Sequence, residues 1–215
     1  MLTEVARILL GYLLGSVSGS LLLGRWRGVD IRQQGSGNAG GTNALRTQGF
    51  RFALGVIVID VGKAALAAWA GGYGIADERR ALVVALLAGA AAAAGHVWPV
   101  YYGFRGGKGV AAVLGVLLVL WPTGALIMVV TALLVLGISG YVGLGSILAG
   151  LALIPAAALI APEPHRGLWT VAAAVVAVFI LYTHRSNVQR LWAGTEHRFE
   201  RARVLVRLVR GKPRD

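Results

Sequence analysis

Two glycine-rich polar stretches interrupt a chain that is otherwise almost wholly apolar. The first spans residues 35–46 and ends in Arg46, and the second spans residues 103–109 and contains Lys108. Small residues let backbone N–H groups converge on an anion, and a nearby Arg or Lys supplies the compensating charge. Both stretches therefore predict loops that bind phosphate groups.

The first stretch is dense in hydrogen-bonding groups, which distinguishes it from a flexible linker of Gly, Ser and scattered charge. Arg46 adds a forked cation suited to bidentate contact with phosphate. The alternative is a simple re-entrant turn between helices. The candidate ligand-binding residues of this stretch are Ser36, Gly37, Asn38, Thr42, Asn43 and Arg46.

The same stretch matches the dinucleotide pattern G-x-G-x-x-G at Gly35, Gly37 and Gly40, with Asp60 at the expected distance. That fingerprint must follow a strand and open a helix within a βαβ unit. Here an apolar run and a basic linker precede the loop, and Asp60 falls inside the next apolar run. We therefore set the dinucleotide interpretation aside.

In the second stretch, Lys108 lies where a helix is expected to begin, so its ammonium and the free helix N–H groups could act on one anion. Anchoring of the chain by a cytoplasmic positive charge is the plainer alternative for Lys108. Gly107 lets the backbone approach the same ligand. His96 closes the preceding apolar run and is either a ligand-binding residue or a packing residue beside Pro99. The stretch is not a P-loop, since Gly109 stands where Ser or Thr would be needed.

Two segments further along add polar groups. Residues 143–146 form a short polar break that could bring Ser146 to the same surface. His184 and Asn187, three apart on a continuing helix, are expected to project from one face. Glu196 follows them in the sequence Gly-Thr-Glu.

Composition indicates an integral membrane protein. The chain has 57% hydrophobic and 14% charged residues, far from the values of a soluble domain. We expect an all-α polytopic membrane protein with about seven transmembrane helices, a count of five or six remaining open because three runs are short for the roughly 20 residues a span needs. The apolar runs cover residues 4–24, 52–71, 81–98, 109–121, 123–140, 146–161 and 168–183.

The basic residues predict the orientation. In the seven-span arrangement sixteen Lys and Arg fall on one side and four on the other, with Lys63 inside a span. The positive-inside rule makes the first side cytoplasmic, so the N-terminus would lie outside, the C-terminus inside, and both glycine-rich loops in the cytoplasm. We expect residues 1–197 to form the membrane domain and residues 198–215 a basic cytoplasmic tail resting on anionic lipid, with Ala202, Leu205, Val206 and Val209 at helical spacing.

Several functions are disfavoured. The chain has no cysteine, and its four histidines lack a metal-ligand spacing, so we predict no metal site and no cofactor. The net charge of +12 is explained by topology and anionic lipid, and no soluble basic domain is available for nucleic acid. Asp60 and Lys63, three apart inside the second run, predict an i,i+3 ion pair facing the bundle. Such a pair could also shape the site.

Four motifs occur in a fixed order along nearly the whole chain. They are GSGNAGGTN at residues 35–43, GH at residues 95–96 leading to GGKGV at residues 106–110, LGSI at residues 144–147, and HRSN at residues 184–187 leading to GTE at residues 194–196. Together they resemble the bacterial acyl-phosphate-dependent glycerol-3-phosphate acyltransferase family, PlsY.

The resemblance implies transfer of the acyl group of a fatty acyl phosphate to the 1-hydroxyl of sn-glycerol 3-phosphate, at the cytoplasmic face of the bacterial cell membrane. Its partners would be these two substrates and membrane lipid, and the oligomeric state stays open. By similarity, the catalytic residues would be Ser36, His184, Asn187, Lys108 and Arg46. The substrate-binding residues would be Gly37, Asn38, Thr42, Asn43, His96, Gly107, Ser146 and Glu196.

An acyl phosphate is a mixed anhydride with a good leaving group, so positioning and charge stabilisation can carry much of the barrier without a strong protein nucleophile. The hydroxyl proton would go to His184 or to a phosphate oxygen of the substrate, and the sequence does not decide between them. The strongest alternative from another class is a transporter of an organic phosphate, which would need a polar path across the bilayer or an inverted repeat.

Overall fold

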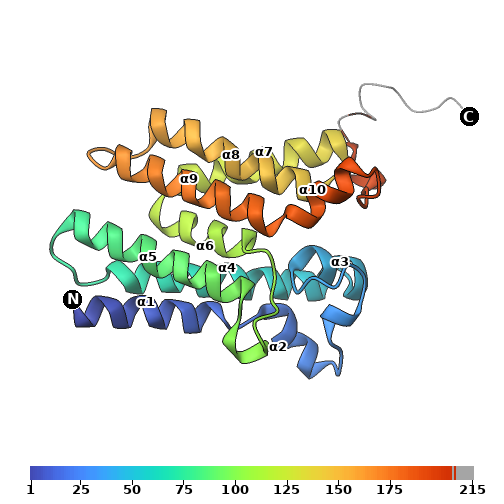
Figure 1. Ribbon diagram of the computed structural model, residues 1–215, viewed down its shortest axis with the longest axis horizontal. Helices are drawn as coiled ribbons and strands as arrows, with labels where there is room; N and C mark the ends of the chain where they lie inside the picture. The colour runs from blue at the N-terminus through green and yellow to red at the C-terminus, as the bar shows by residue number, and fades with distance from the viewer. Residues whose placement is uncertain (205, 207–215) are drawn as a thin grey trace, which may run out of the picture. The chain divides into compact units, whose positions relative to one another are not determined.

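The computed structural model describes residues 1–204 and 206 and forms two compact units, residues 1–122 and 123–215. All regular secondary structure in the described part of the chain is helical, which confirms the expected all-α class (Figure 1). The first unit contains α1 (Leu2–Gly15), α2 (Gly19–Trp26), η1 (Ile31–Gln33), α3 (Gly41–Gln48), α4 (Phe50–Gly72), α5 (Glu78–Val97), η2 (Val100–Tyr102) and α6 (Val110–Leu120). The second contains α7 (Pro122–Ser139), α8 (Val142–Ile160), α9 (Arg166–Thr183), α10 (Arg185–Trp192) and η3 (Glu200–Ala202).

In the first unit α4 is the central helix, and α1, α2, α3, α5 and α6 all pack against it (Figure 1). Close approach depends on small residues, as is usual between helices in a membrane. A Cβ atom at Gly15 of α1 would lie 2.1 Å from the carbonyl oxygen of Ala92 in α5. A Cβ at Gly115 of α6 would lie 2.2 Å from the carbonyl oxygen of Val61 in α4. The contacts between α1 and α5 and between α4 and α6 therefore form at backbone distance.

In the second unit α8 packs along α9, and the short α10 contacts both. Small residues again mark the contacts, with Gly145 of α8 facing Ala132 of α7 and Gly150 facing Ile180 of α9. Large apolar side chains on the outer face of α9, such as Val171, Val175 and Val178, are exposed. Apolar residues on an outward face are what a lipid environment requires.

Each of the seven apolar runs contains helix, but their lengths differ. Five helices, α4, α5, α7, α8 and α9, are long and apolar enough to cross a membrane, and the count is six if α1 and α2 form one span. α6 has 11 residues, about 17 Å at the usual rise, which is short of the roughly 30 Å hydrocarbon core. The structure thus supports five or six spans of full length, together with the shorter apolar helix α6.

The first run differs from the single helix expected over residues 4–24. It is broken after Gly15 and resumes at Gly19, with a bend of 45° between α1 and α2. A break exposes backbone groups that need partners inside a membrane, and buried side chains described below supply them.

Two further boundaries also differ from the expectation. Residues 143–146 are not a break, because the turn lies at Gly140, with φ of +80°, and α8 already begins at Val142. The helix after residue 168 does not continue through His184, since α9 ends at Thr183 and α10 begins at Arg185. The side chains of Thr183 and His184 both contact the carbonyl of Ile180, a pattern associated with bent helices. Of the proposed tail helix, Leu205 and Val209 lie outside the described residues.

Candidate active site

The first glycine-rich stretch is organised around the side chain of Asn43. This amide is buried, with 2% exposure, at the start of α3. Its Nδ2 donates to the carbonyls of Ile31 (3.1 Å) and Gln34 (2.9 Å), and its Oδ1 accepts from the backbone N–H of Ser36 (3.0 Å). Gly35 is required beside it, since its φ is +57° and a Cβ there would lie 2.3 Å from Asn43 Oδ1. Asn43 therefore fixes the shape of this loop.

The remaining polar residues of the stretch lie around this fixed turn. Ser36 is exposed at its tip, and Thr42 is half-buried in the first turn of α3. Arg46 follows Thr42 by four residues, on the same face of α3, and is exposed. Gly37, with φ of +72°, and Asn38 connect the turn to the helix. The loop thus leads directly into a helix N-terminus, where backbone N–H groups favour anions.

The second stretch folds back on the end of α5. The N–H groups of Gly106 and Gly107 donate to the carbonyls of Val97 and His96, each at 3.1 Å. The loop lies so close that a Cβ at Gly106 would be 2.1 Å from the carbonyl oxygen of His96. Lys108 is half-buried immediately before Gly109, the residue that caps α6. The expectation that Lys108 stands at a helix N-terminus is confirmed.

The two stretches meet at Gly107. A Cβ atom there would lie 3.1 Å from the carbonyl oxygen of Ala39 in the first stretch and 2.2 Å from Nε2 of His96. Gly107 therefore lies between the His96 ring and the first stretch, and any larger residue there would clash with the ring. The first unit thus brings together two segments about 70 residues apart in the chain.

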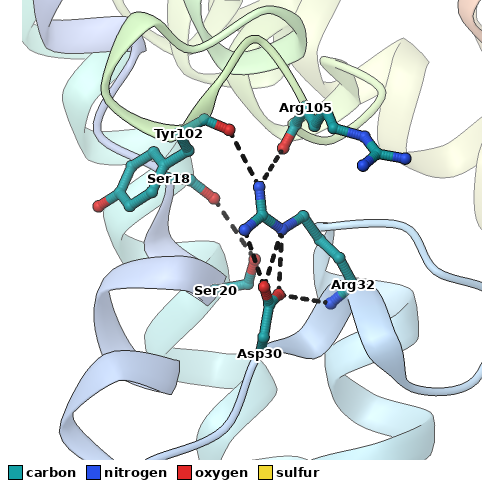
Figure 2. A network of polar contacts seen from close by, with 6 residues as sticks. All are labelled: Ser18, Ser20, Asp30, Arg32, Tyr102 and Arg105. Carbon is teal, nitrogen blue, oxygen red and sulfur yellow. Dashed lines mark hydrogen bonds and ion pairs between the residues drawn. The ribbon is translucent and has the colours of Figure 1, made fainter.

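Arg32 joins η1, just before the first stretch, to the turn at the start of the second stretch (Figure 2). Its guanidinium forms an ion pair with Asp30, with 2.8 Å between NH2 and Oδ2. NH1 donates to the carbonyl of Tyr102 at 3.0 Å and is 3.5 Å from that of Arg105. The hydrogen bond from Arg32 holds the pKa of the Asp30 carboxyl below its usual value. Sequence reasoning counted Arg32 only in the charge balance, although the spacing Asp-x-Arg before a glycine loop was a usable signal.

Asp60 and Lys63 form the expected ion pair, with 2.9 Å between Oδ1 and Nζ, and both side chains are buried. Asp60 Oδ1 also accepts from the N–H of Gly19 at 3.0 Å, and Lys63 Nζ donates to the carbonyl of Val17 at 2.6 Å. These two backbone groups belong to the break between α1 and α2. The ion pair therefore supplies the partners that the broken helix needs.

His96 connects this ion pair to the second loop. Its Nδ1 lies 3.1 Å from Lys63 Nζ and 3.3 Å from Asp60 Oδ1, and its Nε2 faces Gly107. The ring is 2% exposed. A direct contact between His96 and substrate stays a prediction. The imidazole therefore lies between the buried Asp60–Lys63 ion pair and the second glycine-rich stretch.

In the second unit, Asn187 and Glu196 lie together. Asn187 Nδ2 donates to Glu196 Oε1 at 2.6 Å, and Arg190 Nε donates to Glu196 Oε2 at 2.6 Å. A Cβ on Gly143 would lie 2.6 Å from Asn187 Nδ2, so the first turn of α8 contacts this amide. Ser146 follows Gly143 by three residues on the same face of α8, and its hydroxyl donates to the carbonyl of Val142 at 3.1 Å.

His184 lies between α9 and α10 and is 4% exposed. Its Nδ1 is 2.9 Å from the carbonyl oxygen of Ile180. Thr183 Oγ1 is 3.3 Å from the same nitrogen. A carbonyl can only accept, so a hydrogen bond from Nδ1 to Ile180 requires the proton on Nδ1, and in that tautomer of the neutral ring Nε2 carries the lone pair.

The residues that the structure describes contain no group of three or more His, Asp or Glu side chains that could hold a metal ion. The first unit contains the two glycine loops with Arg46 and Lys108, and the second unit contains His184, Asn187, Ser146 and Glu196.

The chain matches known proteins over most of its length. Residues 5–194 match the family model "Glycerol-3-phosphate acyltransferase". A glycerol-3-phosphate acyltransferase of Chlorobaculum tepidum is 40% identical, over 92% of this chain and 97% of that protein. One of Shouchella clausii is 43% identical, over 90% of this chain and 95% of its own length.

The structure also resembles a solved one, the integral membrane glycerol 3-phosphate acyltransferase PlsY (YgiH) in its glycerol 3-phosphate form. The TM-score is 0.81 at 34% sequence identity, covering 94% of this chain and 98% of the other. The lysophosphatidic acid form of the same enzyme gives a TM-score of 0.80 at the same identity. Matched over almost its whole length, the chain belongs to the glycerol-3-phosphate acyltransferase family and is an integral membrane protein of the PlsY type.

Proposed function

We propose that this protein transfers the acyl group of a fatty acyl phosphate to the 1-hydroxyl of sn-glycerol 3-phosphate, releasing 1-acyl-glycerol 3-phosphate and inorganic phosphate. Membership of the family supports acylation of glycerol 3-phosphate. The observation that carries the donor is the contact at Gly107, where two glycine-rich loops, each leading into a helix N-terminus, lie against each other. Two such loops suit a reaction in which both substrates carry phosphate.

In this proposal Arg46 and Lys108 neutralise substrate phosphate. Arg46 is exposed on α3, and Lys108 precedes the cap of α6, where the helix dipole adds to its charge. Ser36, Gly37, Asn38 and Thr42 would surround the phosphate held by the first loop. The side chain of Asn43 makes three hydrogen bonds, all with backbone groups of residues 31–36, so we assign to it the positioning of Ser36.

Gly107 and His96 are assigned to the second loop. Gly107 provides the close approach of the backbone, and His96 supports it from within the bundle. In the second unit, Ser146, Asn187 and Glu196 would bind glycerol 3-phosphate. The Glu196 carboxylate holds Asn187 and Arg190 in place through two hydrogen bonds. The amide of Asn187 is thereby oriented for a hydroxyl or phosphate oxygen.

The chemical step forms one bond and breaks another. The 1-hydroxyl oxygen attacks the acyl carbon, the bond between that carbon and the phosphate oxygen breaks, and its electron pair leaves with inorganic phosphate. The hydroxyl proton must be accepted during attack. The contact of His184 Nδ1 with the Ile180 carbonyl leaves Nε2 as the nitrogen that can accept this proton. The alternative acceptor is an oxygen of the substrate phosphate.

We place the reaction at the cytoplasmic face of the bacterial cell membrane. The support is the distribution of Lys and Arg, which puts both glycine loops and the C-terminal region on the positively charged side. Acyl phosphate would reach the site from lipid and glycerol 3-phosphate from the cytosol. We further propose that residues 1–197 carry this activity and that residues 198–215 contact anionic lipid.

The test is release of phosphate by the purified protein, in detergent or lipid, from palmitoyl phosphate and glycerol 3-phosphate, with palmitoyl-CoA as the parallel donor. We expect release that requires both substrates and that is matched by lysophosphatidate formation, and no acylation from palmitoyl-CoA. Acylation of glycerol 3-phosphate from palmitoyl-CoA but not from palmitoyl phosphate would overturn the proposal that acyl phosphate is the donor. No turnover with either donor, from protein shown to be folded, would favour transport and call for a flux assay in liposomes.

The residue assignments are tested by Arg46→Ala and Lys108→Ala. Each removes a charge opposed to phosphate, and we expect activity to fall by at least about 100-fold, as for loss of a preorganised electrostatic contact. Arg25→Ala is the control, since Arg25 is exposed on α2. Near-normal turnover in both variants would overturn the site assignment.

A further inference from the structure

We infer that Arg32 is a positioning residue that holds the Lys108 loop against the first glycine loop, and that it does not itself bind substrate. This inference rests on the proposed function for its kinetic readout only. Arg32 lies three residues before Gly35, in η1. From the sequence alone it could be one more cation that binds phosphate, but its contacts indicate that it positions the loop.

Both edges of the Arg32 guanidinium contact protein groups (Figure 2). Nε and NH2 donate to the two carboxylate oxygens of Asp30, at distances of 2.8 to 3.2 Å. NH1 donates to the carbonyl of Tyr102 at 3.0 Å, with that of Arg105 at 3.5 Å. Bidentate pairing with a carboxylate neutralises the charge that a phosphate ligand would need. The fork is therefore engaged by the protein itself.

The carbonyls that Arg32 contacts belong to the turn that shapes the second loop. Tyr102 ends η2, and Gly103 and Phe104 follow with φ of +65° and +59°. A left-handed conformation is unfavourable for Phe and persists only where surrounding contacts impose it. The N–H of Phe104 donates to the carbonyl of Pro99 at 2.9 Å. Arg32 contacts the carbonyls of the residues on either side of this left-handed pair.

From Arg105 the chain runs directly through Gly106 and Gly107 to Lys108. The side chain of Arg105 is directed away from Arg32 (Figure 2), so that only its carbonyl takes part. Gly107 then meets Ala39 of the first loop. Arg32 thus ties the second loop to η1, which directly precedes the first loop, while His96 contacts Gly107. Without Arg32, the turn at residues 102–105 would lose its hydrogen bonds to η1.

Asp30 orients the guanidinium. Its Oδ1 also accepts from the backbone N–H of Arg32 at 2.9 Å, as the cap of η1. The side chains of Asp30 and Arg32 are 31% and 29% exposed. Asp30 therefore acts through Arg32, and its replacement should have a smaller effect in the same direction.

The experiment compares Arg32→Ala, Arg32→Lys and Asp30→Asn with Arg25→Ala and Arg25→Lys as matched controls. Lys keeps the charge but, as a single ammonium, cannot pair with Asp30 and reach the carbonyl of Tyr102 at once. We expect kcat/KM for acyl transfer to fall roughly 10- to 100-fold in both Arg32 variants, as for misplacement of a binding loop. Asp30→Asn should lose less, and Asp30→Asn with Arg32→Ala no more than Arg32→Ala alone.

Hydrogen exchange gives a readout independent of activity. The amides of Gly106 and Gly107 are hydrogen-bonded to α5, and we expect them to exchange faster in the Arg32 variants but not in the Arg25 variants. Millimolar guanidinium chloride, against matched sodium chloride, should restore part of the activity of Arg32→Ala and none of the activity lost on Lys108→Ala. A merely structural role would not give such rescue.

Two results would overturn the inference. The first is wild-type exchange at residues 104–107 in Arg32→Lys, and the second is wild-type kcat/KM in that variant, which would show that only the charge matters. If Arg32→Ala does not fold, Arg32→Lys and Asp30→Asn carry the test. Wild-type protein that acylates nothing would refute the proposed function, while the exchange measurement would still decide whether Arg32 holds the loop.

Discussion

At the scale of single residues, the space around Gly107 determines whether the two loops can meet. The ring of His96 and the carbonyl of Ala39 leave no room for a methyl group. Overpacking of this kind costs roughly 1–3 kcal/mol, and at a site it also displaces the loop. Glycine is therefore needed at position 107 because it has no side chain.

We expect Gly107→Ala to lower kcat/KM by about 100-fold, as a displacement of the order of 1 Å can. Gly62→Ala is the matched control, because nothing lies within 4 Å of a Cβ at that position of α4. Thermal unfolding and steady-state kinetics should show lower stability and lower kcat/KM for Gly107→Ala than for Gly62→Ala. Equal activity would mean that the contact at Gly107 does not shape the site.

The ion pair of Asp30 and Arg32 predicts a dependence of stability on acid. The hydrogen bond from Arg32 lowers the pKa of Asp30 below its usual value of 3.8. The stabilisation is therefore present above pH 3.8 and is lost as the pH falls below it through the lower, folded pKa.

We expect the melting temperature of Asp30→Asn to be lower than that of the wild type at pH 7, and the difference to shrink below pH 3.8. Thermal unfolding in detergent across this range measures it. A difference that stays constant down to pH 2 would show that the pair contributes nothing through its charge.

At the scale of helices, the bend between α1 and α2 depends on side chains from another helix. Asp60 and Lys63 of α4 bind the N–H of Gly19 and the carbonyl of Val17. Within a bilayer no water can replace these partners. The two charges thus neutralise each other and also complete the backbone hydrogen bonds of a broken span.

Removing one charge should cost far more than at an exposed pair of the same spacing. We expect Asp60→Asn or Lys63→Met to destabilise the protein by about 3–5 kcal/mol, because one buried charge is left alone. The control is Glu163→Gln, which breaks the exposed i,i+3 pair with Arg166 and should cost at most about 1 kcal/mol. Similar losses of thermal stability in all three variants would contradict this account.

Most of the helices could be predicted from the sequence. Apolar runs predicted each long helix because hydrophobicity alone selects membrane segments, and the spacing of Asp60 and Lys63 predicted their pairing. The bend at residues 16–18 was not predictable, since Ser16 and Ser18 are common inside membrane helices and give no break signal. The contacts of Asn43 and Arg32 were also missed, because side-chain type shows that a group can hydrogen-bond but not which distant carbonyl it will reach.

At the scale of the whole molecule, the charge distribution predicts which ends face the cytoplasm. The chain lacks cysteine, so single introduced cysteines report position without background labelling. We expect Ala76→Cys, in the loop between α4 and α5, to react with a membrane-impermeant maleimide in intact cells. Ala193→Cys, after α10, should react only after permeabilisation. Both positions are exposed, and the reverse pattern would overturn the orientation and the proposed cytoplasmic site.

The contacts of Arg32 with residues 102 and 105 determine which substitutions these positions tolerate. The groups that Arg32 holds on the second loop are main-chain carbonyls, which every amino acid supplies. Position 105 is exposed and is therefore free to change side chain without loss of the contact. Position 102 is restricted by the packing of Tyr102 against the core of the first unit, and position 32 has no substitute that offers the same fork. In a saturation library selected for growth, tolerance should be broad at position 105, limited to similar side chains at position 102, and absent at position 32.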